Sequence, residues 1–206
     1  MLGRKSGREG NSMAQPFTPE QREAIRARLV ASARRHALDT GFKKTSLDML
    51  TAEAGISKSS FYKFFDSKEM LFLEIAGQWE SQVISAAMAS LAAAQGRSDK
   101  ERAAAMVLTA FETIHKLGII RFLCEDLPQV VSAVPEDIAR EHYLSSAQRI
   151  FSALHQAQIH FTVPEDIACS VIKIMYLSIL HINEIGETFF AALRELVVSA
   201  CDRLVA

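Results

Sequence analysis

The sequence predicts an all-α fold built from two helical modules, and three observations lead to this prediction. Helix-start signals recur along the chain, apolar residues follow them at spacings of three and four, and no segment shows the two-residue alternation of a strand. Hydrophobic residues make up 49% of the 206 positions and charged residues 23%, which is the composition of a globular protein and excludes wholesale disorder.

The two expected modules differ in charge. Residues 1–75 contain 13 Lys and Arg against 9 Asp and Glu, whereas residues 76–206 contain 10 against 15. The formal net charge of −1 therefore hides a basic first module and an acidic second one. A basic module favours a polyanionic partner.

The chain begins with a segment that carries no helix signal. Residues 1–16 are small and polar and are expected to form a disordered arm. Thr18-Pro19-Glu20-Gln21 then provides an N-cap, a proline at the first helical position and a glutamine three residues after the cap. These signals predict a helix that ends near Gly41, a residue suited to the left-handed backbone that follows many helices.

The later helices are predicted in the same way. Asp66 with Glu69, and Ser98 with Glu101, are expected to form capping boxes for the helices that follow them. Helices are expected at about 46–54, 58–64, 66–94, 99–116, 135–158, 164–183 and 187–204, with a short helical piece between Gly118 and Pro128.

Residues 46–65 have the pattern of a helix-turn-helix, which needs two short helices, a sharp turn that usually contains glycine, and apolar residues that lock the helices together. Gly55 supplies the turn, and Ser57 is placed to cap the second helix. The apolar lock consists of Leu47, Leu50, Ala54, Ile56, Phe61 and Phe64. When these apolar residues are buried, the outward face of the second helix carries Lys58, Ser59, Tyr62 and Lys63, and Ser60 lies near its edge. Such side chains suit phosphates and base edges, although a helical hairpin with a solvated polar face has the same spacing.

Residues 22–75 resemble the DNA-binding domain of TetR-type transcriptional regulators. The resemblance rests on Gly41-Phe42, Thr45-Ser46, Ala54-Gly55-Ile56-Ser57-Lys58, Phe61-Tyr62, Phe65 and Ser67-Lys68-Glu69 with Leu71-Phe72. It implies a homodimeric repressor that binds a palindromic operator in double-stranded DNA and is released by a small-molecule effector. We therefore expect a disordered arm over 1–16, a DNA-binding domain over 17–75, and a ligand-binding and dimerisation domain over 76–206.

The resemblance also assigns DNA contacts residue by residue. Thr45 and Ser46 are expected to touch phosphate, and Tyr62 and Lys68 to hold the DNA backbone. The positions expected to face the groove are Ser57, Lys58, Ser59, Ser60 and Lys63. The chain departs from the family pattern at Ser59, where glycine is common, at Phe64, which replaces His or Tyr, and at Thr51, which replaces alanine. The hydroxyl of Thr51 is expected to bond back to the preceding turn.

The last two long helices are too apolar to face water on any side. The stretch 164–183 is apolar nearly all round, and 187–204 has a similar excess. A helix without a polar face must be covered on both sides, and we expect the second cover to be another subunit; the alternative is a central helix within one subunit. TetR-type dimers, which pair their last two helices, imply the same arrangement. The expected dimer contacts are Ile167, Val171, Ile174, Phe189, Leu193, Leu196 and Val197.

The second module also contains aromatic and polarisable residues that could line a pocket for an unknown, mainly apolar effector. These candidates are Trp79, Met106, Phe111, His115, Phe122, Tyr143, Phe151 and Tyr176. Plain core packing is the alternative role for each of them.

No catalytic or metal-binding constellation stands out, so we expect neither an enzyme nor a cofactor. The six histidines show no ligand spacing, and Cys124, Cys169 and Cys201 form no CxxC pair. The sequence shows neither a signal peptide nor an apolar run of the ~18 to 20 residues that a membrane span needs, and a cytoplasmic protein without a membrane partner is expected. Two alternatives stay open: a helical ligand-binding or enzymatic protein with a vestigial helix-turn-helix, and a regulator that senses thiol oxidation.

Overall fold

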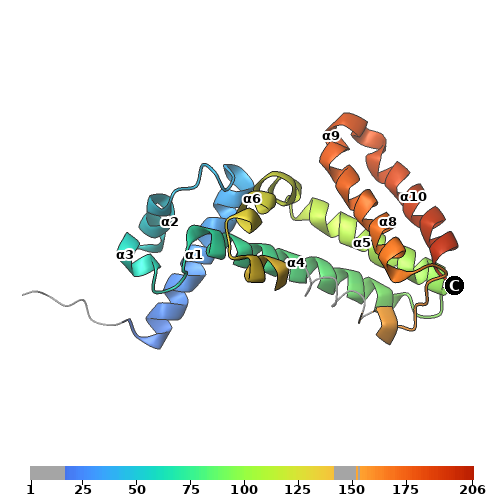
Figure 1. Ribbon diagram of the computed structural model, residues 1–206, viewed down its shortest axis with the longest axis horizontal. Helices are drawn as coiled ribbons and strands as arrows, with labels where there is room; N and C mark the ends of the chain where they lie inside the picture. The colour runs from blue at the N-terminus through green and yellow to red at the C-terminus, as the bar shows by residue number, and fades with distance from the viewer. Residues whose placement is uncertain (1–16, 142–151, 153) are drawn as a thin grey trace, which may run out of the picture.

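A computed structural model describes residues 17–141, 152 and 154–206 of the protein. These residues form helices, turns and one isolated bridge between Phe161 and Val205, so the all-α prediction is confirmed. The long helix α4 (Lys68–Ala93) begins in the N-terminal module and runs beneath the C-terminal one, as Figure 1 shows. The expected arm over 1–16 lies outside the described residues.

The N-terminal module consists of α1 (Pro19–Asp39), α2 (Leu47–Ala54), α3 (Lys58–Phe61) and the start of α4. The predicted capping box of Thr18 is present, and Gly55 adopts φ +71° at the turn between α2 and α3. Helix α3 has only four residues and continues as turns, so the expected helix over 58–64 was too long. The predicted cap at Asp66 was wrong by one residue, because the Met70 N–H donates to the hydroxyl of Ser67 at 3.1 Å.

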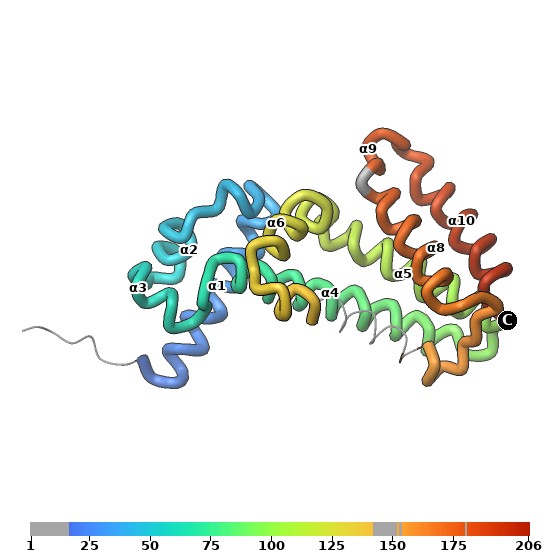
Figure 2. The backbone as a smooth tube through the Cα atoms, in the orientation of Figure 1, coloured from blue at the N-terminus to red at the C-terminus, as the bar shows by residue number. Residues whose placement is uncertain are grey.

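Of the predicted apolar lock, Leu50, Ala54 and Phe61 are buried, whereas Leu47, Ile56 and Phe64 are partly buried against the same core. Leu29 of α1, Leu50 of α2, Phe61 of α3 and Phe72 of α4 have no exposed surface. Because each helix contributes a fully buried side chain to one core, the angle between α2 and α3 is fixed by packing. Figure 2 shows this compact group of helices at one end of the molecule.

In the C-terminal module, α5 (Asp99–Lys116) returns along α4, and its predicted capping box between Ser98 and Glu101 is present. The π-helical segment η1 (Phe122–Asp126) then leads directly into α6 (Leu127–Ser132). Pro128 was expected to end this helical piece, but it lies in the first turn of α6, where a missing N–H costs nothing.

The C-terminal hairpin consists of α8 (Glu165–Ser178), η2 (Ile179–His181), α9 (Ile182–Ile185), η3 (Gly186–Thr188) and α10 (Phe189–Leu204). The predicted helix 164–183 is therefore interrupted, and α10 packs against α5 (Figure 1). Of the predicted helix 135–158, residues 136–141, 152 and 154–156 are helical, and residues 142–151 and 153 lie outside the described residues. No helix in the described part of the chain is long and apolar enough to cross a membrane.

Candidate nucleic-acid interface

Local hydrogen bonds define the helix-turn-helix. Ser57 caps α3 by accepting the N–H of Ser60 at 3.2 Å, as predicted, and its hydroxyl lies 3.0 Å from the hydroxyls of both Ser59 and Ser60. The Thr51 hydroxyl donates to the Leu47 carbonyl at 2.9 Å, which confirms the predicted bond to the preceding turn. The start of α3 is therefore capped before any partner arrives.

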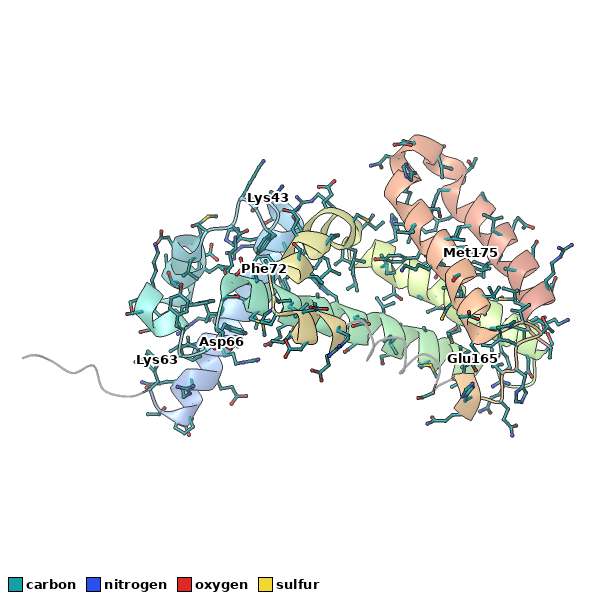
Figure 3. All side chains as sticks on the ribbon, viewed as in Figure 1. Lys43, Lys63, Asp66, Phe72, Glu165 and Met175 are labelled. Carbon is teal, nitrogen blue, oxygen red and sulfur yellow. The ribbon has the colours of Figure 1, made fainter. Side chains whose placement is uncertain are left out.

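The second helix of the motif presents the polar face that the sequence predicts. Lys58, Ser59, Tyr62 and Lys63 are exposed, and Ser60 is half-buried. Ser46 and Ser57 are also exposed, at the starts of α2 and α3. Lys63 lies on the outer surface of the module (Figure 3). These side chains form one surface of ammonium groups, hydroxyls and a phenol, which can donate to phosphate and to base edges.

Two lysines of this surface have partners that the sequence did not reveal. The Nζ atom of Lys58 is 2.7 Å from Oδ2 of Asp48, which lies in the first turn of α2. The ammonium of Lys63 lies 5.7 Å from the ring centre of Phe17, and the Lys63 carbonyl accepts a hydrogen bond from Arg22. The charge signs were readable in the sequence, but the pairing depends on how α2 and α3 meet.

Thr45 does not lie on this surface, contrary to expectation. Its side chain is 1% exposed, and its hydroxyl donates to the Gly41 carbonyl at 2.8 Å. A buried hydroxyl that is already bonded to the backbone cannot offer its donor to a phosphate. The residue instead holds the loop that leads from α1 into α2.

Lys68 also differs from its expected role as a contact to the DNA backbone. Its ammonium donates to the carbonyls of Phe42 at 3.1 Å and Thr45 at 2.9 Å, and it lies 4.0 Å from the centre of the Phe42 ring. Burial lowers the pKa of Lys68, whereas the nearby Glu69 and Asp126 carboxylates act in the opposite direction. The side chain thus fixes the loop before α2 from within the module.

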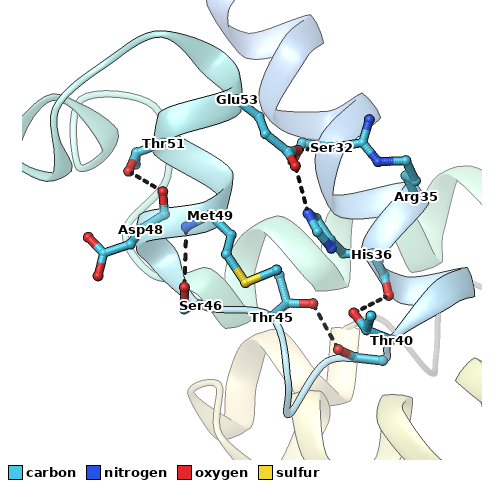
Figure 4. A network of polar contacts seen from close by, with 11 residues as sticks. Ser32, Arg35, His36, Thr40, Thr45, Ser46, Asp48, Met49, Thr51 and Glu53 are labelled. Carbon is cyan, nitrogen blue, oxygen red and sulfur yellow. Dashed lines mark hydrogen bonds and ion pairs between the residues drawn. The ribbon is translucent and has the colours of Figure 1, made fainter.

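A polar network sets the position of α2 against α1 (Figure 4). The Glu53 carboxylate accepts hydrogen bonds from the Ser32 hydroxyl and the Arg35 guanidinium, and one of its oxygens is 3.0 Å from Nε2 of the buried His36. The Ser32 hydroxyl is the main cause that holds the pKa of Glu53 below its usual value, and His36 and Arg35 act in the same direction. The network therefore orients the surface without belonging to it.

The C-terminal module contacts this assembly at the end of α1. The Arg121 guanidinium donates to the carbonyls of Ala37 at 2.8 Å and Leu38 at 3.0 Å, which lie in the last turn of α1. Gly41 follows with φ +89°, and a Cβ atom there would lie 2.8 Å from Nη1 of Arg121 and 3.2 Å from Oδ2 of Asp126. Arg121 therefore satisfies carbonyls that the helix end leaves free, and glycine is required beside it.

A family model described as bacterial regulatory proteins of the tetR family matches residues 29–75, which span the motif and the packing around it. The N-terminal module is a TetR-family DNA-binding domain. The resemblance seen in the sequence is thereby confirmed for this module, and the chain has the fold of TetR family transcription regulators, with an N-terminal helix-turn-helix and a helical C-terminal domain.

Solved structures extend the TetR fold over most of the chain. A TetR family transcription regulator from Marinobacter aquaeolei VT8 is 21% identical, with a TM-score of 0.61, 91% of this chain and 99% of that chain covered. A TetR transcriptional regulator from Rhodococcus sp. RHA1 is 15% identical, with a TM-score of 0.58 and coverages of 88% and 96%. The regulator FadR from Bacillus subtilis, solved in complex with stearoyl-CoA, is 14% identical, with a TM-score of 0.59 and coverages of 84% and 98%. No curated protein matches the sequence.

The C-terminal domain of this TetR-type chain contains a small apolar cavity of about 30 Å³. Met106 of α5, Met175 of α8 and Val197 of α10 are among its walls. Met106 is thus the sole described residue of the expected ligand set that lines this cavity. Tyr143 and Phe151 lie outside the described residues. The other candidates pack elsewhere: the ring of Trp79 contacts that of Phe122 with centres 5.1 Å apart, and the ring of His115 contacts that of Phe190. Phe111 is buried in the core, and Tyr176 is half-buried on α8.

The expected dimer contacts divide into two groups. Phe189, Leu193 and Val197 are buried within the chain, so their assignment to a subunit interface was wrong. They form the face of α10 that the chain itself covers, and α10 packs against α5. Val171 is half-buried and lines the cavity. The exposed members are Ile167, Ile174 and Leu196, joined by Leu177, which the sequence prediction omitted.

Metal and thiol chemistry find little support in the described residues. In the described ranges, no group of three His, Cys, Asp or Glu side chains could hold a metal ion. Burial raises the pKa of Cys124 and of Cys201 to about 11, and it raises that of Cys169 as well. Because the thiolate is the reactive species, these values argue against the thiol-sensing alternative.

Proposed function

We propose that this TetR-type chain is a homodimeric repressor that binds a palindromic operator and is released by a small, mainly apolar ligand. The division into a DNA-binding domain over 17–75 and a ligand-binding and dimerisation domain over 76–206 belongs to the same proposal. The observation that carries it is the exposed polar face of the capped α3, set in a TetR-family domain. A helix-turn-helix that no longer binds DNA would not require this exposed polar face.

The DNA contacts of the proposal come from the exposed surface. Lys58, Ser59 and Lys63 face base edges, with Ser57 and Ser60 beside them, whereas Ser46 and Tyr62 meet the phosphate backbone. A two-fold dimer presents two copies of α3, so the half-site centres of the operator lie roughly 34–36 Å apart, or a multiple of that.

Dimerisation is supported by an exposed apolar strip that α8 and α10 leave uncovered. Ile174 is 68% exposed and Leu196 57%, and Ile167 and Leu177 continue the strip along α8. Large apolar side chains left exposed on two helices that contact each other are typical of a surface that another protein covers. A second copy of the hairpin fits the strip, because two-fold pairing places the same residues opposite each other.

The cavity supports an apolar effector and indicates how it would act. A volume of about 30 Å³ holds roughly one or two molecules the size of water. A larger ligand must therefore displace the walls, which α5, α8 and α10 provide. Since α8 and α10 also carry the exposed strip, binding in the cavity would change the pairing of the two subunits.

The test is sedimentation of the full chain at micromolar concentration, for the wild-type protein and for two matched variants. Leu196→Glu should shift a dimer towards monomer, because it buries a charge in the strip. Val198→Glu introduces the same charge on α10, but on the opposite flank of its buried face, and should leave the dimer intact.

A monomeric wild-type protein would refute the dimer and the two-half-site operator with it. Equal dissociation of both variants would refute the assignment of the strip. Ligand release is tested separately, by adding medium-chain and long-chain fatty acyl compounds to the dimer bound to DNA and measuring the bound fraction. If no such compound lowers that fraction, a fatty acyl effector is excluded.

A further inference from the structure

Asp48 places a carboxylate on the surface that the N-terminal module offers to DNA. It lies in the first turn of α2, and its Oδ2 atom is 2.7 Å from Nζ of Lys58, the first residue of α3. Asp48 is 71% exposed and Lys58 54%, so water and DNA can reach both charges. Figure 4 shows Asp48 on the outer side of α2, away from Glu53, which faces α1.

This acid opposes DNA binding in general. Three exposed cations lie on the same elements: Lys43 and Lys44 precede α2, and Lys63 follows α3. The other exposed acids there are Glu53, which faces α1, and Asp66, which lies just before α4. A carboxylate among the cations repels phosphate and occupies the ammonium of Lys58, which would otherwise release a counterion from any DNA. We therefore expect Asp48 to affect which DNA sequence the protein prefers.

We propose that Asp48 is a specificity-determining residue, an inference that rests on the proposed operator binding. On random DNA the ion pair withholds Lys58 from the phosphates. On the operator, Lys58 and Asp48 together read one base-pair edge in the major groove.

The chemistry of that edge fits a paired ammonium and carboxylate. Guanine presents the acceptors O6 and N7, and the N4 amino group of its cytosine lies beside them as a donor. The ammonium of Lys58 donates to guanine, and the carboxylate of Asp48 accepts from cytosine, so both charges gain a partner. At a phosphate only Lys58 gains a partner, and Asp48 is left unpaired next to negative charge.

The decisive variant is Asp48→Asn in the full chain, which removes the charge and keeps the shape. One probe is a duplex that the wild-type protein selects from a random-sequence pool, and the other is a scrambled duplex of the same composition. Freed Lys58 should make the variant bind the scrambled duplex about threefold to tenfold more tightly, with a salt slope steeper by about 1 per half-site. The selected duplex should not gain affinity, so its preference over the scrambled one falls by at least that factor.

Two controls separate this role from general electrostatics. Asp39→Asn removes an exposed acid at the end of α1 and makes the same change in net charge. It should shift both duplexes alike and by less. In a Lys58→Met background, Asp48→Asn should no longer steepen the salt slope on scrambled DNA, because no ammonium is left to release.

The proposal is overturned if Asp48→Asn changes both duplexes equally, as Asp39→Asn does, or if its effect persists in Lys58→Met. Either result leaves operator binding intact and removes the role of Asp48. If the wild-type protein selects no duplex at all, the proposed function itself fails.

Discussion

Lys68 offers the sharpest test of how the DNA-binding surface is held, because its side chain could serve either DNA or the protein. In the structure its ammonium donates to the carbonyls of Phe42 and Thr45 and lies over the Phe42 ring. Lys68→Met keeps the aliphatic stem and removes all three interactions. Hydrogen bonds of a charged group are each worth about 1.5–3 kcal/mol and an exposed cation–π contact about 0.5–1 kcal/mol. Since the site is only half-buried, we expect a loss of about 2–4 kcal/mol in the free energy of unfolding.

The assay combines urea unfolding at a fixed protein concentration with DNA titrations at several salt concentrations. Because the loop before α2 loses its anchor, Lys68→Met should also weaken DNA binding. Its salt slope should stay that of the wild-type protein, since no phosphate contact is lost. Lys63→Met is the matched control: it removes an exposed ammonium from the same module and should change stability by less than about 1 kcal/mol.

The opposite pattern would refute this reasoning. If Lys68→Met unfolds at the wild-type urea concentration and its salt slope falls by about 1 per half-site, Lys68 contacts phosphate and does not anchor the loop.

Three further outcomes follow from the structure. Gly41→Ala should lower the free energy of unfolding by about 1–2 kcal/mol or more, because the left-handed backbone disfavours a Cβ and Arg121 stands 2.8 Å from its position; wild-type stability in urea would contradict this. The lowered pKa of Glu53 means that its stabilisation is present above the unfolded value of about 4.3 and is lost as the pH falls through the folded value. The stability gap between wild type and Glu53→Gln should thus narrow in acid titrations below about pH 4, and a gap that stays constant to pH 3 would refute it. With pKa values of about 11, Cys124 and Cys201 should react with iodoacetamide at neutral pH at least about tenfold more slowly in the native chain than in urea, and equal rates would contradict their burial.

Local signals predicted the helix starts well where a single cap residue was available. Thr18 and Ser98 each have a reciprocal partner three residues later, and both capping boxes are present. At Asp66-Ser67 two adjacent side chains can cap, and the pattern chose the one with Glu at the right spacing. The structure uses Ser67 instead, so neighbouring cap candidates are distinguished by the fold and not by the motif.

The role of Lys68 could not be predicted because its partners are distant in sequence, and the role of Thr45, which bonds to the Gly41 carbonyl four residues away, depends on how the loop before α2 folds. The Lys68 ammonium donates to carbonyls 23 and 26 residues away, and a sequence pattern does not show which backbone carbonyls will accept a hydrogen bond. From the sequence alone, a polar residue near a DNA-binding motif is therefore interpreted as a DNA contact, and only the loop geometry shows that it bonds within the protein. By contrast, helical spacing correctly predicted that Lys58, Ser59, Tyr62 and Lys63 are exposed, although Tyr62 and Lys63 lie in the turns that follow α3.

For the C-terminal hairpin, the apolar composition predicted that other residues must cover the helices. It did not predict which face of each helix is covered. Leu196 and Val197 are neighbours in the sequence, yet Leu196 is exposed and Val197 is buried, because one residue turns a helix face by 100°. A helix that is apolar all round has no polar face to set this angle. Packing against α5 supplies the missing information.

The joint between the two modules offers a route within one chain by which an effector can act on DNA binding. Arg121 binds the last carbonyls of α1, and beyond Gly41 the loop into α2 is held by Lys68. Both cations stand near the buried Asp126, which is 6% exposed and belongs to the π-helical segment η1. A shift of η1 against α1 would break the Arg121 bonds and move the Asp126 carboxylate, which lies beside the loop into α2. A ligand that leaves η1 in place changes no contact to this loop and therefore cannot move it by this route. Coupling by this route therefore requires that displacement of the cavity walls reach η1.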